Sequence, residues 1–311
     1  MSGRSRLCSI LVFLICFAAA AFLNACQRDG NSADIEPDDI EAEEIIGRVE
    51  LPDLVAGGQR YVDTRDETPP ESAPAMAPIP EEVNTELPEF GEYADVSEKK
   101  EDFFDFLRPI IQKENQKVLR ERGHVLLLWD RYQAEDALSA REIESIDALA
   151  EKYRVDASYD EGEEFFMEML LRIDKIPESL ALIQAATESG WGTSHFAREG
   201  NNLFGQWCFS EGCGIVPRRR PEGATYEVRA FDDVGDSVRA YILNLNRHPA
   251  YSDLRRMRYR MRLAGKQPDA ELLAGGLEQY AEIGMQYVNT LQQMIRGNER
   301  FMGIHEPASE S

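Results

Sequence analysis

A sharp change in composition near residue 97 limits where this chain can form a compact fold. Residues 27–97 are rich in Asp, Glu, Pro, Gly and Ser and contain little periodic apolar sequence. Such a segment buries too little apolar surface to offset the conformational entropy lost on folding. We therefore predict a disordered, acidic, Pro-rich tether over 27–97. The folded body is expected from about residue 98 to 303, before a short tail at 304–311.

The first 26 residues have the pattern of a secretory signal. Arg4 and Arg6 precede an apolar run, 7–23, which is short for a membrane span of about 20 residues. The run ends in Leu23-Asn24-Ala25-Cys26, which resembles the lipobox of bacterial lipoproteins and predicts lipidation of Cys26. With Gln27 next, we expect an outer-membrane lipid anchor, the body lying on the periplasmic side. An ordinary signal peptide and an uncleaved anchor are the alternatives, and both also place the body outside the cytoplasm.

The charge balance excludes some partners. The chain has 57 acidic and 34 basic residues and a net charge of -23, which argues against nucleic acid as a partner. Two arginine runs, 218–220 and 255–262, are expected to be solvated surfaces. We expect no cofactor and no metal, because no cofactor motif is present and His195 and His248 lack metal-ligand spacing.

The body reads as mainly helical. Apolar residues recur at helical spacing after residue 98, and Ser139 with Glu142 forms a capping-box pattern. Another helix is expected over 165–173. Residues 98–160 carry no chemical signature and are interpreted as a helical extension, whereas 161–303 contain the informative motifs. The first apolar stripe consists of Phe103, Phe104, Leu107, Ile110 and Ile111.

Glu188 is the strongest candidate for a catalytic group. Pro177 suits the first turn of a helix and Gly190 suits its C-cap, so Glu188 is expected in the last helical turn. The partial negative charge of a helix C-terminus disfavours an ionised carboxylate, and Trp191 could shield the carboxyl from water. Both effects raise a carboxyl pKa, as a general acid for glycosidic cleavage requires. The alternative is a solvated Glu at a frayed helix end.

Several motifs together resemble glycoside hydrolase family 73, the endo-β-N-acetylglucosaminidases that cut bacterial peptidoglycan. They are Ala185-Ala-Thr-Glu-Ser-Gly-Trp-Gly192, Phe196 and Asn202-Leu-Phe-Gly205. The Bax-type members are the nearest in pattern, through Gln206-Trp-Cys208, Cys213-Gly-Ile-Val-Pro217 and Asn246-Arg-His-Pro-Ala-Tyr251. The resemblance covers about 165–303. It implies an α+β, mainly helical, lysozyme-like domain with a small β-hairpin lobe beside the cleft, with Glu188 as general acid and peptidoglycan glycan strands as substrate.

The family also implies an acidic residue on the hairpin lobe. Residues 214–231 read as strand, turn and strand, with Pro221-Glu-Gly223 as the turn. Glu227 lies within the second strand, where the pleat fixes its direction, whereas Glu222 lies at the mobile turn. We therefore prefer Glu227 as the second carboxylate and place Glu222 second. A solvated edge-strand Glu is the alternative for both.

Aromatic residues and two cysteines complete the candidate site. Tyr280 matches the tyrosine that the family uses near the cleaved bond, and Tyr287 matches a second tyrosine at the start of the last helix. The candidates for contact with substrate are Trp191, Trp207, Tyr226 and Tyr287. Core packing is the alternative for Trp207 and Tyr226, and a structural role is the alternative for Tyr287. Cys208 and Cys213 are spaced to close a small loop by a disulfide in an oxidising compartment, or remain two free thiols.

These observations predict a hydrolase of the β-1,4 bond between N-acetylglucosamine and N-acetylmuramic acid. A lysozyme or lytic transglycosylase would cut after N-acetylmuramic acid instead. Trp191-Gly192 and the Asn-Leu-Phe-Gly segment argue against those classes. A non-catalytic peptidoglycan-binding lipoprotein is the third possibility, favoured by the lack of an acid on the first hairpin strand over 216–220.

Overall fold

The computed structural model describes residues 82–303. The predicted signal, Cys26, the tether up to residue 81 and the tail lie outside the described residues. The described part falls into two units, of which Arg260–Lys266 belongs to one and all the rest to the other. In the first, the Lys266 N–H donates to the Met261 carbonyl at 2.9 Å and closes a turn at Gly265. The second unit contains every candidate site residue that the structure describes.

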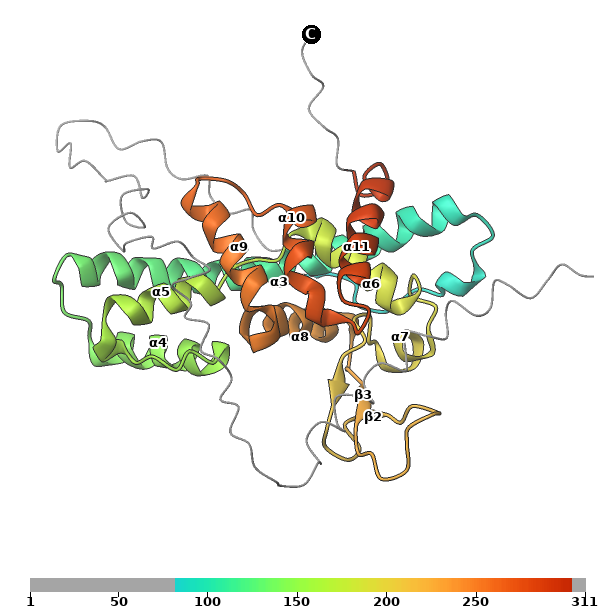
Figure 1. Cartoon of the computed structure of the whole chain (residues 1–311), viewed down its shortest axis with the longest axis horizontal. Coiled ribbons are helices and arrows are strands. Elements are labelled where there is room, and N and C mark those ends of the chain that lie inside the picture. The colour runs from blue at the N-terminus through green and yellow to red at the C-terminus, as the bar shows by residue number, and fades with distance from the viewer. Residues whose placement is uncertain (1–81, 304–311) are drawn as a thin grey trace, which may run out of the picture. The chain divides into compact units, whose positions relative to one another are not determined.

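Helices dominate the second unit (Figure 1). Short 3-10 helices cover Phe90–Glu92, Tyr159–Glu161, Pro249–Tyr251 and Gly275–Tyr280. Within residues 82–303 no helix combines the length and apolar character needed to cross a membrane. The α-helices are α3 (Val96–Gln133), α4 (Ala140–Tyr153), α5 (Glu163–Arg172), α6 (Glu178–Ser189), α7 (His195–Gly200), α8 (Val234–Arg247), α9 (Ser252–Leu263, which runs into the other unit), α10 (Ala270–Ala274) and α11 (Met285–Asn298).

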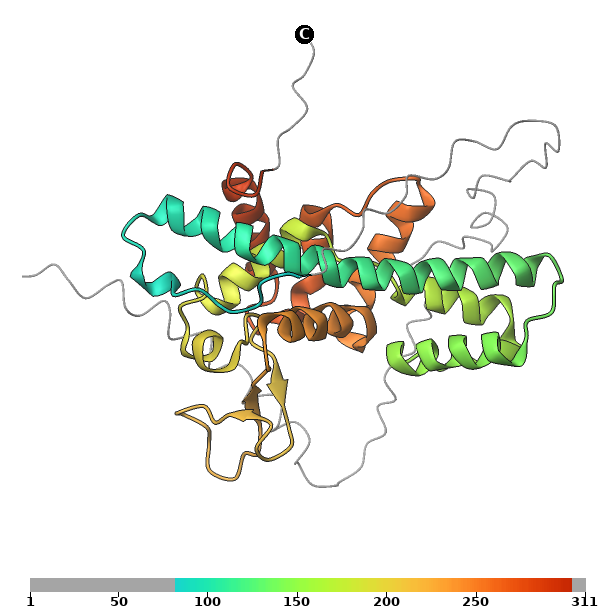
Figure 2. The same ribbon diagram turned by 180° about the vertical axis from the view of Figure 1, so that it is seen from behind.

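Helix α3 packs against α5, α6 and α8, as seen from behind in Figure 2. Asp95 caps its start by accepting hydrogen bonds from the N–H groups of Ser97 and Glu98. The predicted apolar stripe lies at the contact, and each of its five side chains is at most 1% exposed. The segment interpreted as an extension therefore shares one hydrophobic core with the helix that carries Glu188.

Residues 82–95 are also part of the folded body, so the prediction of a tether up to residue 97 was wrong. Phe90 is 1% exposed and packs edge-on against Phe103 at 5.2 Å. The Thr85 hydroxyl donates to Asp233 at 3.2 Å, and its carbonyl accepts from the Val234 N–H. The buried ring of Phe90 holds this segment on the body. The segment has no helical or strand periodicity in its apolar residues, so the sequence pattern did not reveal the contact.

The predicted hairpin is present, but as part of a three-stranded sheet. The strands β1 (Trp207–Cys208), β2 (Gly214–Ile215) and β3 (Glu227–Arg229) lie in the order β1-β3-β2, and both pairings are antiparallel. The turn at residues 221–223 lies in the connection between β2 and β3. Gly214 is required here, because a Cβ at this position would lie 2.0 Å from the Val228 carbonyl oxygen.

The arginine-rich segment 255–262 is only in part a solvated surface, because Arg256 and Arg260 are exposed whereas Arg255 and Arg258 are buried. Arg258 is fully buried, and its guanidinium donates to the carbonyls of Leu171 and Arg172 at the end of α5, at 3.2 and 2.9 Å. Arg255 is 3% exposed and donates to the carbonyl of Leu245 at 3.1 Å. Cations at helix C-termini are stabilising because they meet unpaired carbonyls. These two arginines therefore fasten helix ends within the core, contrary to expectation.

Candidate active site

Glu188 lies in the last turn of α6, as predicted. The helix ends because Gly190 adopts left-handed backbone angles at the C-cap, with φ +59°. Trp191 and Gly192 follow with φ +59° and +74°, so the chain reverses sharply after the acid. The side chain of Glu188 is half-buried. A carboxyl in this position is held by a rigid element and keeps part of its surface exposed.

The two oxygens of Glu188 have different surroundings. Oε1 accepts a hydrogen bond from the Tyr287 hydroxyl of α11 at 2.7 Å. Oε2 faces Gly205, where an added Cβ would lie 3.4 Å from this oxygen. Gly205 has φ +64°, which an L side chain rarely adopts. The Asn-Leu-Phe-Gly segment thus brings bare backbone against one oxygen of the acid.

The protonation of Glu188 differs from that of an exposed glutamate. Burial raises the pKa of its carboxyl from 4.5 to about 7, and the Tyr287 hydrogen bond opposes this rise because it favours the ionised form. Burial is the larger effect. The helix C-terminus acts in the same direction as burial, since its partial charge is negative. A substantial fraction of Glu188 therefore carries a proton near neutral pH.

Tyr280 and Tyr287 are stacked beside the acid. Their ring centroids are 5.5 Å apart and the rings are inclined by 2°. Tyr287 touches the carboxyl directly, whereas the Tyr280 hydroxyl donates to the Phe204 carbonyl at 2.8 Å. Burial raises the pKa of both hydroxyls well above 10, so both stay neutral. Tyr280 links the segment before Gly205 to the stacked pair.

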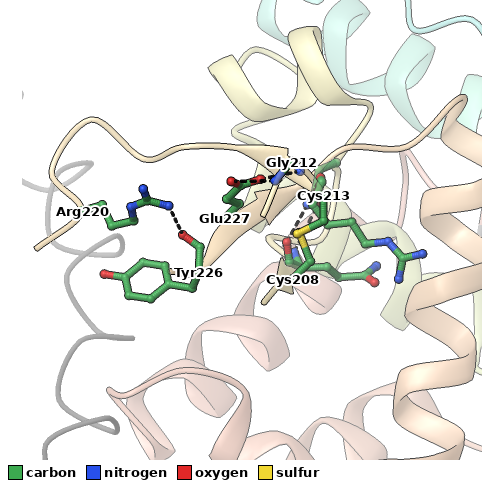
Figure 3. The surroundings of a disulfide bond; sticks show 10 residues. Cys208, Gly212, Cys213, Arg220, Tyr226 and Glu227 are labelled. Atoms are coloured by element: carbon green, nitrogen blue, oxygen red, sulfur yellow. Dashed lines mark hydrogen bonds between the residues drawn. A yellow bond between two sulfur atoms is a disulfide. The ribbon is translucent and has the colours of Figure 1, made fainter. Parts of the chain in front are cut away.

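Glu227 is held by the loop of its own lobe. It is 4% exposed, and its carboxylate accepts from the N–H groups of Gly212 and Gly214 at 3.1 and 2.8 Å (Figure 3). The Cys208–Cys213 disulfide closes the same loop, which resolves the two cysteine alternatives in favour of a bond. These contacts brace the β1–β2 loop. Glu222, by contrast, is exposed in the β2–β3 connection.

The disulfide also bears on metal binding. Cys208, Cys213 and Glu227 are the described side chains close enough together to share an ion. Two of those three ligand atoms are the sulfurs joined in the disulfide. The bonded form therefore does not offer two thiolates to a metal.

The candidate sugar-binding aromatics lie in two different places. Trp207 and Tyr226 form an edge-on pair at 4.8 Å on the β lobe. Trp207 is half-buried, whereas Tyr226 is 6% exposed and packs beneath it, contrary to the expectation that Tyr226 contacts sugar. Trp191 instead packs on α3, against Phe103 and Phe104 at 5.6 and 5.3 Å. The backbone reversal after α6 directs its ring to that helix. The ring contacts that the structure describes for Trp191 are thus with α3, and its shielding of Glu188 stays a prediction.

Two polar residues that no sequence motif marked, Gln184 and Tyr241, form hydrogen bonds behind Glu188. Gln184 is fully buried, lies four residues before Glu188 and donates from Nε2 to the Tyr287 hydroxyl oxygen at 3.1 Å. Its Oε1 accepts from the Tyr241 hydroxyl of α8 at 2.5 Å. Residues four apart share a helix face, so a buried amide at this spacing from the acid was the available signal.

Comparison with known proteins agrees with this geometry. Residues 163–300 match the model of the family described as Mannosyl-glycoprotein endo-beta-N-acetylglucosaminidase. Protein bax of Escherichia coli (strain K12) is 33% identical over 222 residues, which cover 71% of this chain and 78% of that protein. No solved structure matches the chain.

The match of this helical domain to the family model places the chain in the class of glycoside hydrolase domains. Within that class, the chain belongs to the glucosaminidase family and is of the Bax type.

Proposed function

We propose that the chain is an endo-β-N-acetylglucosaminidase that hydrolyses the β-1,4 bond between N-acetylglucosamine and N-acetylmuramic acid in peptidoglycan. The observation that carries the proposal is Glu188, a helix-end carboxyl with a pKa of about 7 that one tyrosine holds by a single oxygen. The family description supports the bond type, and the motifs that resemble peptidoglycan hydrolases support the substrate.

In this mechanism Glu188 donates its proton to the glycosidic oxygen as the bond to the anomeric carbon breaks. The leaving sugar departs as an alcohol, and positive charge develops on the ring that remains. A water molecule adds to the anomeric carbon and loses a proton, which restores the protonated carboxyl when Glu188 accepts it. Tyr287 supports the ionised intermediate by its hydrogen bond to Oε1.

The stabiliser of the developing charge is a separate part of the proposal. Glu227 is our first candidate for the second carboxylate and Glu222 is the second, in the order that the sequence alone suggested. Glu227 would have to exchange the amides of Gly212 and Gly214 for the substrate. The N-acetyl group of the sugar is the third candidate. We propose that Trp207, which packs on the buried Tyr226, stacks on a sugar ring and that Tyr280 contacts the substrate near the cleaved bond.

The envelope location is proposed from the sequence. The body would be held on the periplasmic side of the outer membrane by a lipid on Cys26, with the acidic segment after it as a spacer. Metabolic labelling with a lipid analogue tests this, since label should disappear in Cys26→Ala. Label that persists in this variant would refute lipidation at Cys26.

The activity is tested by digesting purified peptidoglycan with the full chain and reducing the products with borohydride. Reduced N-acetylglucosamine ends, absent with Glu188→Gln, are the expected result by mass spectrometry. Reduced or anhydro N-acetylmuramic acid ends would indicate a lysozyme or lytic transglycosylase. Wall binding without new ends would indicate a binding lipoprotein.

The pH dependence follows from the same carboxyl. The acid must be protonated to act, so we expect kcat to fall as the pH rises through about 7. Replacing Tyr287 by Phe removes a bond that favours the ionised form, so the fall should move to higher pH, by about one unit. A fall at unchanged or lower pH in Tyr287→Phe would contradict this role.

A further inference from the structure

Three hydrogen bonds behind Glu188 form a continuous chain that starts in the core. The Tyr241 hydroxyl donates to Gln184 Oε1, Gln184 Nε2 donates to the Tyr287 oxygen, and the Tyr287 hydroxyl donates to Glu188 Oε1. The donor–acceptor distances are 2.5, 3.1 and 2.7 Å. The chain connects α8, α6 and α11, the last two of which pack together.

The amide of Gln184 gives this chain a direction. One end of an amide can only accept and the other can only donate, and a hydroxyl has a single proton. Because Tyr241 donates to Oε1, the NH₂ end of Gln184 is directed to Tyr287. The Tyr287 oxygen then receives a hydrogen bond, and its own proton is directed to Glu188.

Tyr241 is built to remain the donor at the start of the chain. Its side chain is 1% exposed, and its ring stacks on Phe204 with centroids 3.9 Å apart. Burial raises the pKa of its hydroxyl well above 10, so the proton stays in place over the working pH range. Gln184 lies fully buried between the two tyrosines, with both ends of its amide satisfied.

We propose that Tyr241 and Gln184 are positioning residues that keep the acidic proton of Glu188 on Oε2, the oxygen that faces Gly205. This inference rests on the proposed function of Glu188 as the general acid. Since Oε1 is occupied as an acceptor by Tyr287, the protonated carboxyl carries its proton on Oε2. The proton then lies on the oxygen that is free of the tyrosine.

The opposite direction would disable the acid. If the amide of Gln184 turned over, its Oε1 would accept the proton of Tyr287, whose oxygen would then accept from Glu188. The acidic proton would be held on Oε1, inside the cluster, and away from the substrate. Tyr241 opposes this arrangement because its hydroxyl would then face the NH₂ group of Gln184, and its buried proton would lose Gln184 Oε1 as acceptor.

The test is a double-mutant cycle on Tyr241→Phe and Gln184→Met in the full chain. Without the Tyr241 hydroxyl the amide can turn over, so Tyr287 donates less to Glu188. We expect the Glu188 pKa in Tyr241→Phe to rise by about half a unit, less than in Tyr287→Phe, and kcat to fall about tenfold with little change in KM. With Gln184→Met there is no amide to turn, so adding Tyr241→Phe should leave the Glu188 pKa unchanged.

The readout is a ¹³C NMR titration of Glu carboxyls, with the Glu188 signal identified by its loss in Glu188→Gln. The matched control is Tyr153→Phe, which removes a buried hydroxyl that donates to Glu121 at 2.6 Å on the helical segment before α5. It should leave the Glu188 pKa at the native value.

Two results would overturn the inference. One is a Tyr241→Phe titration that matches the native chain and Tyr153→Phe. The other is an equal shift with and without Gln184, which a general loosening of the core would produce. In another outcome, the pKa shifts follow the double-mutant cycle while the native protein yields no new sugar ends from peptidoglycan. That result would refute the proposed hydrolysis but not the role of the hydrogen bonds from Tyr241 to Glu188.

Discussion

At the scale of the residue, Glu188 combines a functional pKa with a cost to the folded state. Its carboxyl titrates near 7 in the folded chain and near 4.5 when unperturbed. The folded state therefore binds more protons than the unfolded chain between these values. Stability is highest below about 4.5 and declines as the pH rises through about 7.

Glu188→Gln should therefore be more stable than the native chain at pH 8. Gln stays neutral, so the variant avoids burying a charge, and the gain should be at most about 3 kcal/mol. The difference should disappear near pH 4.5. Urea unfolding at both pH values measures it, with the exposed Glu222→Gln as control. A gain of equal size at both pH values would contradict the titration argument.

Elements determine what the other candidate residues do. Glu227 was selected because a strand fixes its direction, and β3 does fix it, toward the amides of the β1–β2 loop. Two hydrogen bonds to a carboxylate, together with the disulfide, hold this loop in one conformation. A second function for the same carboxylate must be measured separately from this one.

Hydrogen exchange combined with activity separates these roles. In Glu227→Gln one acceptor oxygen becomes an NH₂ group, so at least one of the two amides, of Gly212 or of Gly214, should exchange at least tenfold faster. Glu222→Gln should leave both amides protected. If Glu227 is the second carboxylate, hydrolysis should also fall by a factor of about 100 or more. Faster exchange with full activity would restrict Glu227 to its structural role.

The two tryptophans provide a matched pair on different elements. Trp191 packs on α3 and Trp207 lies half-buried on β1, beside Tyr226. Trp191→Ala should reduce the free energy of unfolding by about 2–3 kcal/mol, since it leaves a cavity beside Phe103. Trp207→Ala should mainly weaken peptidoglycan binding. Thermal unfolding measures the stability of both variants, and sedimentation with cell walls measures their binding. A stability loss confined to Trp207→Ala with a binding loss confined to Trp191→Ala would refute both predictions.

At this scale one can also compare which elements were predictable from the sequence and which were not. The ends of α6 and the capping box of α4 were predictable because Gly190, Ser139 and Glu142 act locally. The strand β1 was not, because two residues carry no periodicity. Gln184 was not among the sequence predictions, because its partners Tyr241 and Tyr287 lie far along the chain. The burial of Arg258 depends on carbonyls 86 and 87 residues away. Long-range partners of this kind are not encoded in local patterns.

At the scale of the whole molecule, the start of the folded body can be located by truncation. A chain that begins at 96 lacks Phe90 and the Thr85–Asp233 contact, whereas one that begins at 82 keeps both. Loss of a buried Phe costs about 2–3 kcal/mol, so the shorter chain should unfold several degrees lower. Calorimetry of the two measures this, and equal midpoints would show that the segment contributes nothing.

Phe90 also reaches the segment that follows the acid. A Cβ on Gly192 would lie 2.7 Å from its ring, so the glycine after Trp191 is the place where the ring fits. The Trp-Gly pair of the family motif thus packs, in this fold, against Phe90 from the segment 82–95 and against α3.

The stretch that is recognisable as a hydrolase is therefore not a portable module. Residues 163–300 contain the acid and its partners, but the surface of α6 and the loop after it are completed by α3 and by Phe90. A fusion protein that contains residues 163–300 alone would expose the apolar surface of α6 and of the loop after it that α3 and Phe90 cover here. The folded unit therefore begins about eighty residues before the stretch that matches the family model.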